Sequence, residues 1–204
     1  MDIIGAIEAR RSIRRFKADP VPRQTIERLL DLATKAPSAK NAQPWSFIVL
    51  EGEKKNAVAG LLADAVVKYE AQGFPTGSAG PTARIMAEAP VLILVYDRYW
   101  IPGEGPPPPR LPAEGFRGAA PANREPDLAD TQSIGAAIEN LALAALAFGL
   151  GTLWIGDVLY IVDQINALVG RDHGLTAAVS VGYPDETPGA RPRRHWSELT
   201  EWQA

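Results

Sequence analysis

Arginine and hydroxyl side chains are concentrated near the start of the chain. The segment RRSIRRF, residues 10–16, places four arginines and one serine within six residues. Guanidinium groups bind phosphate through paired hydrogen bonds, and a short hydroxyl adds another donor. An alternative is that Arg10 and Arg11 only end a first helix, where cations offset the helix dipole. That alternative accounts for neither the serine nor the two later arginines, so a phosphate site remains a hypothesis at this point.

Three other stretches have residues suited to ligand binding. APSAKNAQPWSF, residues 36–47, holds Asn41 and Gln43, whose amides suit the edge of a heteroaromatic ring; alternatively it is only a turn. In GLGTLWIGDV, residues 149–158, Gly149 is suited to ending a helix, Gly151 lets the backbone pass closely and Gly156 ends a strand. Glycines that bracket a buried strand need no ligand, however. A second basic cluster, residues 191–194, is either a further phosphate contact or a solvated tail.

Apolar periodicity predicts the elements that must position these stretches. Helices are expected where apolar residues recur every three to four positions, and strands where short apolar runs are continuous. Taken alone, the alternation of the two favours a parallel α/β sheet. The proline- and glycine-rich residues 97–126 predict a long loop, and we interpret it as a lid in preference to a linker. The helices are expected around residues 3–7, 26–33, 58–69, 134–145 and 161–168, and the strands around 45–52, 90–97, 152–156 and 175–184.

Composition limits the possible functions. The 204 residues carry a formal net charge of −3 and no cysteine, which excludes thiolate chemistry and argues against general nucleic-acid binding. The longest apolar run, residues 134–150, contains Glu139 and Asn140 and indicates a buried helix, so we expect no membrane partner. The first residues show no basic leader, and we therefore expect a cytoplasmic protein.

In their order along the chain, the four segments resemble those of the nitroreductase family of flavin mononucleotide (FMN) enzymes. The resemblance rests on RRSIRRF, PSAKNAQPW, GLGTLWIGD and the basic tail, and it extends over nearly the whole chain. It replaces the parallel sheet with an α+β fold, a mainly antiparallel sheet flanked by helices, in an intertwined homodimer with FMN at the interface. Residues 1–204 would form one FMN-binding domain, with a lid at about 97–126 and a partner-embracing arm at about 184–204.

The resemblance implies a role for each matching residue. The residues that would hold the FMN phosphate are Arg10, Arg11, Ser12, Arg193 and Arg194. The residues that would line the flavin and its ribityl chain, some of them supplied by the other subunit, are Pro37, Ser38, Ala39, Asn41 and Gln43. The residues whose backbone amides would face the ring near N5 and O4 are Ile155, Gly156 and Asp157. A cation near the pyrimidine edge of the ring would be Arg84.

The implied chemistry takes place on the flavin, so no catalytic side chain and no metal is expected. NADH or NADPH would deliver hydride to N5 and leave, and a nitroaromatic, quinone or activated alkene would enter the same cavity, a ping-pong exchange. Trp100 and Phe116 flank the proline-rich part of the lid; they would either cover the open face of the flavin or anchor the loop to the protein. Asp157 replaces a glycine of many relatives, so its carboxylate would alter the flavin potential or the access of acidic substrates.

Other functions are compatible with the same segments. A specialised superfamily member, such as a reductive dehalogenase or a flavin-fragmenting enzyme, would keep the FMN residues and differ in the lid. A flavin-binding protein without turnover would serve storage or redox sensing. A basic interaction module would need exposed arginines and no cofactor. The sequence leaves open the acceptor and the preference between NADH and NADPH.

Overall fold

A four-stranded sheet forms the centre of the computed structural model, which describes residues 2–98, 128–172 and 174–203. The strands lie in the order β1-β2-β4-β3, and each neighbouring pair is antiparallel. The α+β fold with an antiparallel sheet is therefore confirmed, and the parallel sheet that periodicity alone favours is wrong. The strands are β1 (Trp45–Leu50), β2 (Val91–Asp97), β3 (Gly151–Ile155) and β4 (Leu175–Gly182).

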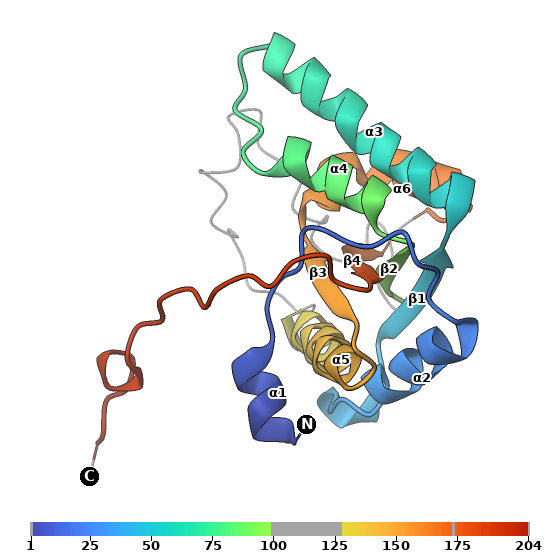
Figure 1. Ribbon diagram of the computed structural model, residues 1–204. Coiled ribbons are helices and arrows are strands. Elements are labelled where there is room, and N and C mark those ends of the chain that lie inside the picture. Colours follow the sequence, from blue (N-terminus) through green and yellow to red (C-terminus); the bar gives the residue numbers. More distant parts are fainter. Residues whose placement is uncertain (1, 99–127, 173, 204) are drawn as a thin grey trace.

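Helices cover both faces of this sheet (Figure 1). One face packs against α3, α4 and α6, and the other packs against α2 and α5. The helices are α1 (Ile3–Ala9), α2 (Arg23–Ala33), α3 (Gly52–Ala71), α4 (Ala79–Glu88), α5 (Leu128–Ala147) and α6 (Val162–Val169). Three short 3₁₀ segments complete the described elements, namely η1 (Ala39–Asn41), η2 (Asp157–Ile161) and η3 (Trp196–Glu198).

The central strand β2 separates two hydrophobic cores. All seven of its residues are buried, which confirms a strand covered on both faces. Because side chains alternate along a strand, Leu92, Leu94 and Tyr96 enter the core beneath α3 and α4. Their neighbours Val91, Ile93 and Val95 enter the core formed with α2 and α5. The sheet is thus the middle layer of three.

A helix that the periodicity misses explains why β1 and β2 are antiparallel. The glycine- and proline-containing segment before α4 resembles a loop, and Pro81 interrupts the pattern. Proline is tolerated there because it lies in the first turn, whose N–H groups have no partner within the helix. The chain therefore leaves β1 along α3 and returns along α4, so that Leu92 pairs with Leu50. A single helix that carried the chain back to the end of the sheet where β1 begins would have produced a parallel pair instead.

The segment after α1 crosses one end of the sheet. Ser12 forms a parallel bridge with Thr152 of β3, and Phe16 forms an antiparallel bridge with Pro184 beyond β4. Between them, Ile13 packs so closely on Gly151 that a Cβ atom there would overlap its side chain. The expectation that this glycine permits a close backbone approach is confirmed.

The end of the chain leaves the rest of the molecule (Figure 1). Every residue from 189 to 203 is exposed, including the aromatic Trp196 and Trp202. Across the residues that the structure describes, we find no helix long and apolar enough to span a membrane.

Candidate functional site

The edge strand β3 brings two of the predicted segments into one site. Near its start, Thr152 bridges to Ser12, and the Thr152 carbonyl accepts a 2.9 Å hydrogen bond from the Ile13 N–H. At its end, Ile155 leads into the turn formed by Gly156 and Asp157. Five strand residues extend over about 17 Å. An elongated ligand could therefore contact both segments along this edge of the sheet.

Arg10 and Arg11 have different surroundings. The Arg10 guanidinium lies 3.1 Å from the Glu139 carboxylate on α5, and both side chains are partly exposed. Arg11 donates to the backbone carbonyls of Glu8 and Arg10, at 2.6 and 2.7 Å. It therefore satisfies acceptors at the C-terminal end of α1, as the helix-ending alternative predicts. Arg10 is the better candidate for an anion, because its partner is a surface carboxylate that an anion could replace.

The two later arginines have structural partners. The backbone N–H groups of Arg14 and Arg15 both donate to the Glu186 carboxylate. The Arg15 guanidinium also donates to the Asp185 carbonyl at 2.9 Å, and the Asp185 N–H donates back to the Arg15 carbonyl at 3.0 Å. These contacts fix the arginine-rich segment to the residues after β4, a role that the sequence did not suggest.

The turn before β1 is conformationally strained. Lys40, Asn41 and Gln43 have φ angles of 52°, 57° and 50°, in the left-handed region that non-glycine residues rarely adopt. Such strain tends to cluster at ligand sites. The Gln43 side-chain amide donates to Asn41 Oδ1 at 3.3 Å, and the Gln43 N–H donates to Ser38 Oγ at 3.0 Å. The two amides predicted to recognise a ring are therefore adjacent in space.

This turn is attached to α5. The Ala39 N–H donates to Ser133 Oγ at 3.4 Å, and the Ser133 hydroxyl donates in turn to the Ala129 carbonyl. Pro37 precedes the turn and lies outside any regular element. Because α5 also carries Glu139, one helix contacts both the segment around Arg10 and the turn before β1.

Asp157 is bonded to a distant helix. Its Oδ2 accepts from Thr82 Oγ1 at 2.6 Å and from Ser78 Oγ at 3.1 Å, at the start of α4. Burial raises the pKa of the nearby Tyr160, with further contributions from the charge of Asp157 and from Tyr69. The ring centroids of Tyr69 and Tyr160 are 6.5 Å apart. A carboxylate and two aromatic rings thus lie beside the end of β3.

Within the described chain, neither the turn before β1 nor the remaining predicted residues are brought to β3. Arg84 is exposed on α4, and its Nε lies 3.7 Å from the Glu88 carboxylate. The Arg193 guanidinium donates to carbonyls of its own segment, and Arg194 is exposed in the tail. Their roles remain predictions. Trp100 and Phe116 lie outside the described residues.

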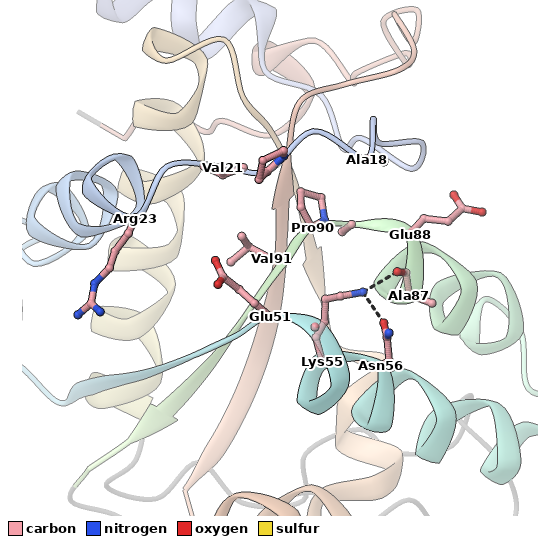
Figure 2. Close-up of a pocket in the computed structure, with 13 residues that line it drawn as sticks. Ala18, Val21, Arg23, Glu51, Lys55, Asn56, Ala87, Glu88, Pro90 and Val91 are labelled. Carbon is pink, nitrogen blue, oxygen red and sulfur yellow. Dashed lines mark hydrogen bonds between the residues drawn. The ribbon is translucent and has the colours of Figure 1, made fainter.

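A separate pocket of about 480 Å³ lies between the start of α3 and the end of α4 (Figure 2). Its wall contains none of the predicted site residues. Lys55 is buried there, and burial lowers the pKa of its ammonium group. The three donors of this group match three acceptors, Asn56 Oδ1 at 2.8 Å and the carbonyls of Met86 at 3.1 Å and Ala87 at 2.5 Å. The Lys55 ammonium group is therefore fully occupied by acceptors at the end of α4, and the other cation in the described wall, Arg23, is paired with Glu27 at 2.8 Å.

Comparison with the families of known proteins gives a match over residues 7–183 to the nitroreductase family. The chain belongs to the nitroreductase family. The predicted family and nitroreductase-like fold are thus confirmed. YfhC of Bacillus subtilis, provisionally named an NAD(P)H nitroreductase, is 30% identical to this nitroreductase over 189 residues, which cover 92% of this chain and 87% of YfhC.

Solved structures of nitroreductases share the fold. A provisionally assigned nitroreductase from Desulfovibrio desulfuricans, in complex with FMN, has a TM-score of 0.72 at 25% identity. That match covers 100% of this chain and 98% of the other. The FMN-dependent nitroreductase NfnB of Mycobacterium smegmatis, in complex with NADPH, has a TM-score of 0.73. That match covers 98% of this chain and 97% of NfnB. At 22% identity, the similarity supports the fold alone.

The residues that sequence reasoning missed are those that hold the predicted ones in place. Ser78 and Thr82 form hydrogen bonds with Asp157. Ser133 forms one with Ala39, and Glu139 forms an ion pair with Arg10. Each of these partners is distant in sequence, and each lies in a helix or at the N-cap position before one, where a polar residue looks like ordinary surface. No local motif could have identified them, because the contacts arise only when the layers pack.

Proposed function

We propose that this nitroreductase is an FMN-dependent NAD(P)H oxidoreductase. It reduces a nitroaromatic, a quinone or an activated alkene in a ping-pong exchange with the nicotinamide donor. The observation that carries the proposal is the placement of Ser12 at the start of β3 and of the turn after Ile155 at the end of the same strand. Family membership and the FMN-containing structural neighbour from Desulfovibrio desulfuricans support the choice of cofactor, and the name of YfhC supports NAD(P)H as the donor.

The donor groups along β3 fit such a cofactor. Arg10, Arg11 and Ser12 supply guanidinium and hydroxyl donors suited to a terminal phosphate. In the turn before β1, at the other edge of the sheet, the adjacent amides of Asn41 and Gln43 supply donors and acceptors suited to the edge of a ring. When bound, FMN supplies the atom that accepts and passes on the hydride.

The protein supplies orientation and electrostatic stabilisation. The turn that starts η2 presents backbone N–H groups that a short helix cannot satisfy internally. Fixed donors of this kind stabilise negative charge where it develops during a reaction. The buried Ile155 and Val158 hold the turn against the core, so these donors need no rearrangement.

A homodimer is part of the proposal. Apolar side chains that a soluble monomer would normally bury are exposed on α1 and in the tail. They are Ile3, Ile4, Ile7, Trp196, Leu199 and Trp202, each at least 59% exposed. A second copy of the chain would cover them and complete the cofactor site. Truncation after Thr187 removes the tail but keeps the Glu186 contacts, so sedimentation should show a monomer or aggregate that has lost FMN. A stable, FMN-loaded truncated monomer would refute the dimeric site.

The visible spectrum of the purified protein tests the cofactor directly. We expect a yellow protein that releases FMN rather than FAD, and that is reduced by NADH or NADPH in an anaerobic titration. A colourless protein that ignores added FMN refutes the proposal. An FMN-loaded protein that neither nucleotide reduces would favour storage or redox sensing instead.

A charge reversal with a matched control tests the phosphate site. Arg10→Glu should abolish FMN retention, because like charges repel. The same substitution also breaks the Arg10–Glu139 pair, so the double variant Arg10→Glu/Glu139→Arg restores that pair in reverse. Both variants should lose FMN if Arg10 binds phosphate. Recovery of FMN binding in the double variant would show that only the ion pair matters.

A further inference from the structure

The Asp157 side chain connects two elements that the sequence keeps far apart. Its backbone belongs to the turn that ends β3, while its carboxylate lies at the start of α4. The 2.6 Å bond from Thr82 joins residues 75 positions apart, and the 3.1 Å bond from Ser78 joins residues 79 positions apart. Both hydroxyls donate to the same oxygen, Oδ2, so the carboxylate is held in one orientation.

The surroundings of the carboxylate favour this arrangement. Ser78 occupies the N-cap position of α4, yet its side chain bonds no amide of that helix. The carboxylate of Asp157 lies at the start of α4 through its bonds to two hydroxyls, and a negative charge near a helix N-terminus is stabilised by the helix dipole. Thr82 is buried, with 6% of its surface exposed, so water competes little for its hydroxyl.

We propose that Asp157 is a positioning residue for the candidate FMN site. Its two hydrogen bonds fix the backbone amides of the turn, and its negative charge lowers the reduction potential of the bound flavin. This inference rests on the proposed function. Reduction adds electron density to the flavin, and a fixed anion in the same turn opposes that change, so FMN should bind less tightly when reduced.

Two substitutions separate the charge from the hydrogen bonds. Asp157→Asn removes the charge and keeps a side chain of the same shape. Thr82→Val removes the shorter hydrogen bond and keeps the charge. Thr82→Ser, which retains the hydroxyl, is the matched control for any general loss of packing at this buried position.

The reduction potential of the FMN-loaded protein tests the effect of the charge. Asp157→Asn should raise the midpoint potential, with reduced FMN gaining at least about threefold in affinity relative to oxidised FMN, or about 14 mV for a two-electron couple. Thr82→Val keeps the carboxylate and should show no such rise. A potential in Asp157→Asn equal to or below that of the parent overturns the proposed role of the charge.

Hydrogen exchange of the full-length chain without FMN tests the positioning. Thr82→Val should accelerate exchange in a peptide spanning residues 153–160 by about tenfold, because a hydrogen bond to a charged group is lost. Thr82→Ser should exchange like the parent. Equal exchange in the parent and Thr82→Val overturns the positioning role. A parent that takes up no FMN refutes the proposed function instead, and the exchange experiment still decides whether Asp157 holds the turn.

Discussion

Replacement of Gly174 by alanine should destabilise the fold more than any comparable glycine substitution at a turn. Gly174 precedes β4 with a φ of 87°, and its carbonyl accepts a 2.7 Å hydrogen bond from the Asp97 N–H. A Cβ atom there would overlap the Asp97 carbonyl oxygen, which is backbone and cannot rotate away. The substitution therefore combines an unfavourable backbone conformation with a steric conflict at the end of β2.

Substitutions at two other glycines help to separate the backbone penalty at Gly174 from the steric penalty. Gly170 caps α6 with a φ of 69°, and no atom lies within 4 Å of an added Cβ. Gly170→Ala should cost about 1–2 kcal/mol, the penalty of the left-handed conformation alone. Gly174→Ala adds an overpacking cost of about 1–3 kcal/mol. Gly60 lies within the helix α3 with free space around it, so Gly60→Ala should stabilise by about 0.5–1 kcal/mol.

Urea unfolding followed by circular dichroism gives the free energies of unfolding of the parent and the three variants. All variants should be compared at one protein concentration, because the stability of a dimer depends on it. We expect the order Gly60→Ala, parent, Gly170→Ala, Gly174→Ala, from most to least stable. Equal losses for the variants at Gly170 and Gly174 would show that the backbone at Asp97 moves freely, and the steric argument would then be wrong.

Three further predictions concern single features. Lys55→Met should lower the free energy of unfolding in urea by about 1–3 kcal/mol, because buried carbonyls at the end of α4 lose their donor. The control Lys54→Met, at an exposed position, should leave it nearly unchanged. Burial raises the pKa of Tyr96 to about 12, so on raising the pH the unfolded chain loses the phenol proton before the folded chain does. Relative to Tyr96→Phe, the free energy of unfolding of the parent should therefore fall by about 1.4 kcal/mol per pH unit between about pH 10 and 12. Parallel pH profiles of the two proteins would contradict this. Replacing Trp100 and Phe116 by alanine should raise the Michaelis constant for quinones or nitroaromatics while FMN stays bound; a loss of thermal stability with unchanged kinetics would favour anchoring of the loop.

The sequence predicted most elements because their signals are local. The continuous apolar run of β2 and the C-cap at Gly170 follow from neighbouring residues alone. The helix α4 was missed because Pro81 and the glycines before it disturb the periodicity. That omission hid the return path from β1 to β2, and the overall alternation of helices and strands favoured a parallel sheet that only the family resemblance corrected.

The candidate site was predictable in its segments but not in its contacts. RRSIRRF identified a cation-rich segment, yet the separate roles of Arg11 and Arg15 depend on α1 and on Glu186. Of the three left-handed residues before β1, only Asn41 is of a type that favours this conformation, and Lys40 and Gln43 give no such signal. Partners such as Thr82 become visible only when α4 packs beside the end of β3.

The bridge between the two ends of the chain has a consequence for protein synthesis. Residues 14–17 find their partners among residues 183–186, some 170 positions later. A ribosome adding about 5–20 residues per second needs on the order of ten seconds or more to produce those partners. Until then the arginine-rich segment lacks its partners among residues 183–186. The contacts that position the candidate phosphate donors should therefore be among the last to form in a nascent chain.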